Sequence, residues 1–198
     1  MNPNRRWFSG IAVVLFSSLA SVSVAFGQAA HVRWDIVSVQ GGNFLPGGVA
    51  AALAEDGSKI VLIGSGTFVA PAGGDGTSSA ATGGGTWQTF SSSNVPTGSG
   101  TYDVTGLVRW EAGLGRAVRP EIDLIDPSDP QHDGLAILRI EYSDGSHGIL
   151  VVSCIFARFT PASVFEGITA SKGFVDYWHH VSTVPGVDAN RTLFHILK

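Results

Sequence analysis

The stretch GLAILRIEYSDGSHGILVVSCIF, residues 134–156, decides the fold class of this chain. In its first half, Ala136, Leu138 and Ile140 lie two residues apart and share one face, whereas Arg139 lies on the other. This period of two is the pattern of a half-buried β-strand. Residues 143–146, Ser-Asp-Gly-Ser, then provide a tight turn, and a second apolar run follows it. The stretch therefore predicts an antiparallel hairpin.

The same spacing of apolar residues recurs along most of the chain after residue 30. We expect strands at residues 31–39, 49–54, 59–63, 102–111, 135–142, 148–157, 165–171, 174–179 and 192–197. A second hairpin is expected at residues 55–58, where an Asp-Gly pair suits the positive φ angles of a tight turn. No segment after residue 30 places apolar residues at helical spacing. The pattern predicts an all-β fold of about eight to ten strands.

Three short windows repeat the order Gly-x-Gly-Thr-aromatic, at residues 64–68, 83–87 and 98–102. Glycine within a β pattern marks a bulge or a close approach of two backbones. We therefore expect each window to open a strand, with its second glycine strained, the residue before that glycine tolerant of a side chain, and its aromatic residue buried. Because glycine kinks and bulges curve a sheet, the repeat favours an antiparallel barrel or meander, with a β-sandwich as the alternative.

Three stretches rich in glycine, in small polar residues or in charged residues predict long loops, at residues 71–85, 91–100 and 113–134. All three lie between expected strands, so none of them marks a domain boundary. We therefore expect a single β-barrel-like domain over residues 30–198.

Residues 1–29 have the composition of a cleaved signal peptide. Arg5 and Arg6 form a positively charged start, residues 11–26 are an apolar run diluted by serine, and small residues allow cleavage after Gly27 or Ala29. The two arginines also fit a twin-arginine signal, with general secretion as the other route. Because the apolar run is shorter than the ~20 residues that span a bilayer, cleavage is favoured over a retained anchor. We expect an extracytoplasmic protein, secreted or periplasmic, from a bacterium.

Composition and charge exclude several classes of partner. The chain carries a net charge of −4, and charged residues make up 14% of it. Nucleic acid and anionic membrane surfaces would both favour clustered lysine and arginine, so we expect neither partner, and no membrane span once the signal is removed. The one cysteine, Cys154, excludes a disulfide within the chain. It lies in a run that is apolar on both faces, which predicts a buried, unreactive thiol.

Two groups of polar residues could carry chemistry. Residues 123–133 hold four aspartates, as a calcium loop would, but their spacing is not that of an EF-hand, so a solvated acidic loop is favoured. The second group would combine His180 with Asp176 and either His195 or His147 in a metal or acid–base site, for which surface histidines are the favoured alternative. Glu111 and Glu166 lie beside aromatic residues, where a carboxyl pKa can rise, but surface strand positions are favoured for both. We assign no metal ligand, no cofactor and no catalytic residue.

Aromatic residues spread over separate strands favour binding over catalysis. In a small barrel they either fill the core or line a pocket with apolar walls and polar tips. The ligand-binding candidates are Trp87, Tyr102, Trp110, Trp178 and His180. We expect a non-catalytic β-barrel protein that binds a small apolar or aromatic ligand. The alternatives are an extracytoplasmic protein-interaction or structural module, or an enzyme with a histidine and carboxylate site at the mouth of the barrel.

The export signal is testable with a reporter protein that folds before export. Residues 1–30 should carry the reporter out of the cytoplasm, and replacement of Arg5 and Arg6 by lysine should block its export if the twin-arginine route is used. Cell fractionation measures the outcome. Unchanged export after the replacement would assign the chain to general secretion, and no export of the unaltered fusion would contradict the signal peptide itself.

Overall fold

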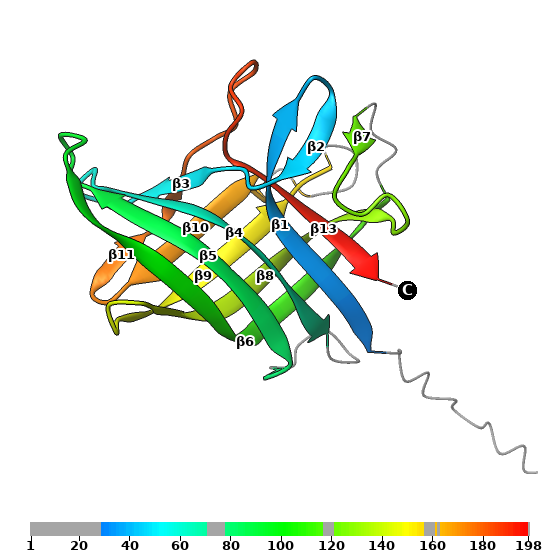
Figure 1. Ribbon diagram of the computed structural model, residues 1–198, viewed down its shortest axis with the longest axis horizontal. Coiled ribbons are helices and arrows are strands. Elements are labelled where there is room, and N and C mark those ends of the chain that lie inside the picture. The colour runs from blue at the N-terminus through cyan, green and yellow to red at the C-terminus, as the bar shows by residue number, and fades with distance from the viewer. Residues whose placement is uncertain (1–28, 71–77, 117–120, 157–160, 162, 198) are drawn as a thin grey trace, which may run out of the picture.

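The structure is a computed structural model that describes residues 29–70, 78–116, 121–156, 161 and 163–197. This part of the chain contains thirteen strands and no helix (Figure 1). The strands are β1 (Ala30–Gln40), β2 (Asn43–Pro46), β3 (Ala50–Leu53), β4 (Lys59–Ala70), β5 (Ala81–Phe90), β6 (Pro96–Arg116), β7 (Ile122–Asp123), β8 (Gln131–Tyr142), β9 (His147–Cys154), β10 (Gly167–Lys172), β11 (Val175–Tyr177), β12 (His179–His180) and β13 (Arg191–Leu197). The all-β prediction is confirmed. Apart from its last residue, the predicted signal peptide, residues 1–29, lies outside the described residues.

The number and lengths of the strands differ from the sequence expectation. Five strands have only two to four residues, which accounts for most of the excess over eight to ten. The expected strand at residues 174–179 is interrupted at Trp178, which separates β11 from β12. All three expected loops are shorter than predicted, because β5, β6 and β8 begin within them. Pairing with neighbours on both sides holds these glycine-rich segments extended, so tertiary context overrides their low strand propensity.

All thirteen strands belong to one sheet, in which only the pairing of β2 with β7 is parallel. A path of antiparallel pairs runs β1–β4–β5–β6–β8, and β13 pairs with both β8 and β1. The hydrogen-bonded path through these six strands therefore returns to its start. β9 and β10 continue the sheet from β8, and the sheet curls visibly across the view in Figure 1.

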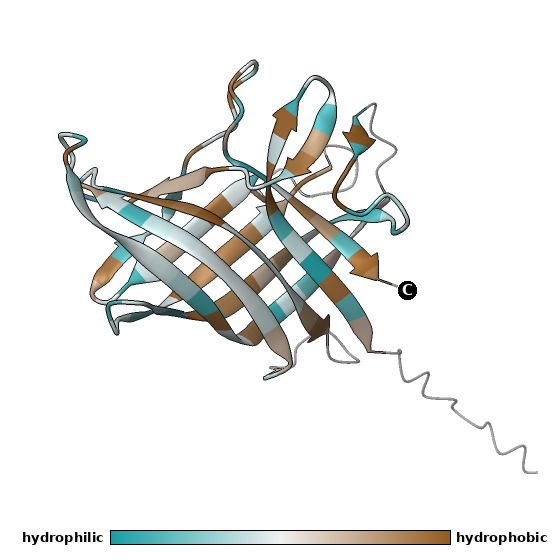
Figure 2. Cartoon of the chain, in the orientation of Figure 1, coloured by the Kyte–Doolittle hydropathy of each residue, from teal (hydrophilic) through white to brown (hydrophobic). Residues whose placement is uncertain are grey.

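Alternation of side chains places the core on the inner face of the curled sheet, and coloured bands along β1 make the alternation visible in Figure 2. The hairpin that decides the fold follows this rule, because Ala136, Leu138 and Ile140 on β8 are each at most 1% exposed. Large rings pack further along the core, where the ring centroid of Trp110 lies 4.7 Å from that of Phe194. Each fully buried large apolar side chain stabilises the fold by about 1.5–3 kcal/mol. Cys154 is fully buried, as predicted.

The three glycine windows lie side by side in β4, β5 and β6. Gly85 of β5 is paired with Gly64 of β4 on one side and with Tyr102 of β6 on the other, and Trp87 is paired with Gly100. The prediction that every window opens a strand is wrong, since the β4 window lies in the middle of its strand. The predicted burial of the aromatic residues is confirmed: Phe68, Trp87 and Tyr102 are 1%, 6% and 1% exposed.

Close approach of backbones explains why glycine is needed in these windows. A Cβ atom on Gly85 would overlap the carbonyl oxygen of Ile63 on β4. Gly84 was expected to tolerate a side chain, but a Cβ there would overlap the carbonyl oxygen of Tyr102. Gly83 has φ +116°, a conformation that side chains rarely adopt, so this window is the most restricted of the three.

Replacement of Gly85 by alanine tests the close approach. We expect a loss of about 1–3 kcal/mol in the free energy of unfolding, because β4 and β5 must separate to admit the methyl group. Gly106 is the matched control, since it also lies in a strand and its Cβ would meet only ordinary contacts of 3.4 Å or more. Gly106→Ala should change stability by less than about 0.5 kcal/mol in urea denaturation. Equal effects of the two replacements would contradict the argument.

Candidate functional site

The five ligand-binding candidates from the sequence fall into two groups. Trp87, Tyr102 and Trp110 are at most 6% exposed and belong to the packed core. Trp178 is 71% exposed, and His180 is exposed as well. The structure therefore places three of the candidates inside the sheet and two on the molecular surface, so they do not line one pocket together.

One of the two exposed candidates, Trp178, lines an apolar groove on the outer face of β8, β9 and β10. The groove has a volume of about 450 Å³. It is lined by Ile137, Ile149, Val151, Phe165, Thr169, Ala170, Ser171 and Trp178. Strand register explains the floor: Ile137 of β8 is paired with Val151 of β9, which is paired with Thr169 of β10. Apolar side chains of β8 and β9 thus form one continuous strip, which Thr169 extends onto β10.

The groove has a signal in the sequence, in two apolar runs of β8 and β9. Residues 135–138 and 149–152 are apolar without interruption, although only alternate positions face the core. The other apolar positions, including Ile137 and Ile149, must then lie on the outer face. An uninterrupted apolar run in a strand with one face buried therefore predicts an apolar patch on the opposite face.

Trp178 forms a wall of the groove and is held by backbone pairing on both sides. The residue before it, Tyr177, is paired with Ala170 of β10, and the residue after it, His179, is paired with Leu53 of β3. Because both neighbours are tied to different strands, the backbone that carries the exposed indole is fixed. An exposed tryptophan on a fixed backbone presents a rigid apolar surface to a ligand.

His180 supports the wall of the groove on the Phe165 side. The imidazole of His180 stacks on the ring of Phe165, with centroids 4.9 Å apart and planes inclined by 22°. Phe165 itself lines the groove, so His180 contributes to the site through this ring. The neighbouring His179 points elsewhere, because its Nε2 lies 3.0 Å from a carboxylate oxygen of Glu55.

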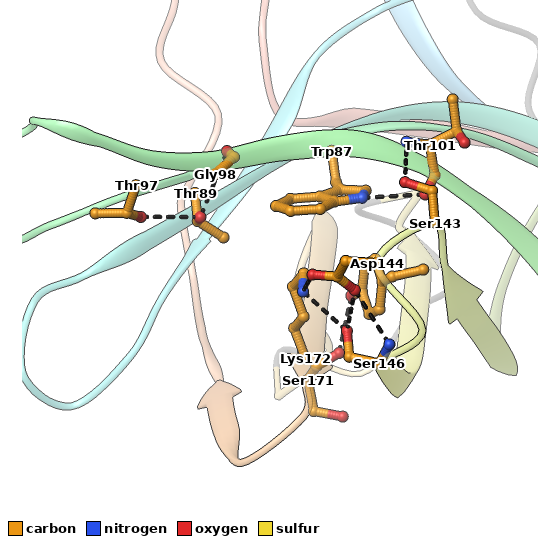
Figure 3. A network of polar contacts seen from close by, with 11 residues as sticks. Trp87, Thr89, Thr97, Gly98, Thr101, Ser143, Asp144, Ser146, Ser171 and Lys172 are labelled. Atoms are coloured by element: carbon orange, nitrogen blue, oxygen red, sulfur yellow. Dashed lines mark hydrogen bonds and ion pairs between the residues drawn. The ribbon is translucent and has the colours of Figure 1, made fainter.

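Trp87 belongs to a polar network at the end of the sheet where β8 and β9 meet (Figure 3). Its indole N–H donates to the carbonyl oxygen of Thr101 at 3.0 Å. The ammonium group of Lys172 lies 4.3 Å from the Trp87 ring and 4.9 Å from the Tyr142 ring, and it is ion-paired with Asp144. The hydrogen bond from Lys172, with others from Ser146, lowers the pKa of Asp144 to about 2. These contacts hold the Trp87 ring in place, and its indole N–H has a hydrogen-bond partner.

A second polar cluster joins β13 to the segment around β7. The Nε2 atom of His195, which is fully buried, lies 2.6 Å from an oxygen of Asp123. Asp123 also accepts a hydrogen bond from the backbone N–H of Ile125 at 2.9 Å. Burial alone would raise the pKa of Asp123, but the hydrogen bonds from His195, Ile125 and Gln131 outweigh it, and the pKa is lowered. Asp123 therefore organises the acidic loop and ties it to the sheet.

The structure gives the remaining acidic and histidine candidates separate surroundings. Glu166 accepts hydrogen bonds from the backbone N–H groups of Ile155 and Thr192, both at 2.8 Å, so it joins three segments of the fold. Glu111 is exposed and ion-paired with Arg109 at 3.1 Å. Among the described residues, no three or more His, Cys, Asp or Glu side chains gather where a metal ion could be held. Within the same residues, no helix has the length and hydropathy to cross a membrane.

The contact between Asp123 and His195 predicts a specific pH dependence of stability. Because the folded-state pKa of Asp123 is lowered from 3.8, its carboxylate stabilises the fold fully above that pH, and this contribution is lost as the pH falls through the lowered value. Asp123→Asn should therefore lower the free energy of unfolding by about 1.5–3 kcal/mol at pH 7 and by less at low pH.

Urea denaturation at both pH values measures the difference, with Asp103→Asn as the control. Asp103 is exposed on β6, so its replacement should change stability by less than about 0.5 kcal/mol. A loss for Asp123→Asn that is independent of pH would contradict the role of the carboxylate.

A comparison of the chain with protein-family models, with curated proteins and with solved structures finds no match in any of the three.

Proposed function

We propose that this chain is an exported, non-catalytic bacterial β-barrel protein that binds a small apolar or aromatic ligand in the groove beside Trp178. The observation that carries the proposal is the indole of Trp178, which is 71% exposed and lines a groove with the apolar side chains of β8 and β9. Exposed tryptophan is costly to leave in water and is a frequent anchor at binding sites. The volume of about 450 Å³ falls in the range of small-molecule sites.

The barrel is supported by the strand pairing. Six strands form a path that returns to its start through β13, and glycine-lined backbones in β4, β5 and β6 allow strong curvature. Closure of a sheet removes the unpaired edges that would otherwise favour aggregation. The outer face of such a barrel is a rigid surface, because every strand of the path is hydrogen-bonded on both sides.

The core aromatics favour the outer groove over the interior as the ligand site. The ring of Trp110 packs against Phe68 at 5.3 Å and against Phe194 at 4.7 Å, and Trp87 packs edge-on against Tyr142 at 5.7 Å. These rings are buried against one another, so their faces are not available to a ligand. Among the tryptophan and tyrosine candidates, Trp178 has by far the most accessible ring, at 71% against at most 6% for the others.

The lining of the groove favours binding over catalysis. Its polar side chains are the hydroxyls of Thr169 and Ser171, and Ser171 already accepts a hydrogen bond from the backbone N–H of Ile149 at 3.0 Å. The described lining contains no carboxylate, imidazole, thiol or amine that could act as a general base or an activated nucleophile.

A protein-interaction module is the second candidate, and one observation favours it. Phe174, at the turn between β10 and β11, is fully exposed, and Val175 beside it is 39% exposed. Both residues expose apolar surface outside the lining of the groove. A partner protein would need this wider surface, whereas a small ligand needs only the groove.

Binding of an uncharged fluorescent dye, N-phenylnaphthylamine, tests the proposed function. The dye should bind saturably to residues 30–198 and protect Trp178 from quenching by acrylamide, since it is the exposed tryptophan among the described ones. Trp178→Ala should weaken dye binding by about tenfold or more, because the variant lacks the main apolar wall.

Phe174→Ala is the matched control, because it removes an aromatic ring that is even more exposed than Trp178 and does not line the groove. The control should bind the dye as the unaltered chain does. Dye affinity unchanged by Trp178→Ala would contradict the site. Equal losses in both variants would favour the wider interaction surface over a small-molecule groove.

A further inference from the structure

Two arginines of β6 and β8 lie next to the groove floor in the sheet, whereas Trp178 follows β11 on the other side of β10. On the outer face, Arg139 of β8 is paired with Ile149 of β9, and Arg109 of β6 is paired with Ile137 of β8. Directly opposed residues in an antiparallel pair have Cβ atoms about 4.5–5.5 Å apart. Both arginine side chains therefore start next to an isoleucine of the groove floor.

Only one of these two cations has a carboxylate partner among the described residues. Arg109 donates to Glu111 at 3.1 Å. Arg139 is exposed and makes no ion pair with any residue that the structure describes. Its guanidinium lies beside β6, 3.6 Å from the position that a Cβ on Gly106 would take. An exposed arginine changes rotamer easily, so this group can turn from Gly106 towards Ile149.

The charged residues around the groove differ from one end to the other. Asp176, on the far side of the groove, is paired with Ser171 and is exposed. Glu141, the next outward residue of β8, is paired with Asp103 of β6 and with His147 of β9. An anionic group would be repelled at Asp176 and near Glu141, and would be attracted where Arg139 meets Ile149.

We propose that the ligand of the groove is an amphipathic molecule whose apolar part lies against Trp178 and whose oxyanion head group, a carboxylate or a phosphate monoester, is bound by Arg139. This inference rests on the proposed function, because it requires the groove to hold a ligand. The guanidinium presents parallel N–H donors that match both kinds of oxyanion. The apolar floor between Arg139 and Trp178 then accommodates a hydrocarbon chain or ring.

Binding of three compounds with the same ten-carbon chain tests the proposal: decanoate, decyl phosphate and decanol. Their affinities are measured by displacement of the uncharged dye from residues 30–198. At least one of the two anions should bind about tenfold more tightly than decanol, and its advantage should fall as salt is added. The comparison between decanoate and decyl phosphate identifies the head group.

Arg139→Gln should remove the advantage of the anion and leave decanol binding unchanged. Arg109→Gln is the matched control, since it removes a neighbouring arginine that already has a partner, and it should preserve the preference. Equal affinities of all three compounds for the unaltered chain, or an anion preference that survives Arg139→Gln, would overturn the head-group inference while leaving the groove intact. If neither the dye nor any of the three compounds binds, the proposed function itself fails.

Discussion

β13 makes backbone hydrogen bonds along both of its edges, to β1 over seven residue pairs and to β8 at two positions. This double pairing joins the first strand of the described chain to a strand about a hundred residues later. Without it, β1 would have an unpaired edge over residues 31–37, and the beginning of β8 would lose its pairing at Gln131 and His132. The closed path holds β8 in place at its first residues, and the pairing of β8 with β9 then carries the outer groove. Such non-local pairing forms only after long loops close, which makes it slow to fold.

Glycines and aromatic rings in the middle strands are complementary. Trp87 lies opposite Gly100, and Tyr102 lies opposite Gly85, so each large ring covers a position where the neighbouring strand has no side chain. The hydroxyl of Tyr102 reaches the place that a Cβ on Gly64 would occupy. Cover of a strand glycine by a neighbouring aromatic ring restores the packing that the glycine loses. The repeated Gly-x-Gly-Thr-aromatic order is therefore a packing pattern shared by three adjacent strands.

The two faces of β8 and β9 serve different purposes. The inner face holds the core, and its residues need only volume and apolarity. On the outer face Ile137, Ile149 and Val151 contribute nothing to that core, and a water-facing strand would normally carry polar side chains there. A bound ligand that covers these three side chains would explain why they are apolar. The proposed ligand, held between the indole of Trp178 and the guanidinium of Arg139, accounts for the apolar strip and for a cation without a described partner.

The sequence alone determined the elements whose pattern is local. The hairpin at residues 134–156, the burial of Cys154 and the burial of the three window aromatics follow from period-two spacing and turn chemistry, and the structure agrees with them. Strand boundaries in glycine-rich segments were not predictable, because β5 and β6 are held extended by pairing with a strand on each side and not by their own strand propensity. The separation of Trp87 from Trp178 is also a tertiary result, since Trp87 lies within β5 and Trp178 between two short strands, and only the packing of the sheet decides which ring is buried. The pairing of Arg139 with Ile149 depends on the register of β8 against β9. The turn between the two strands fixes this register, and the amino-acid composition of the strands does not.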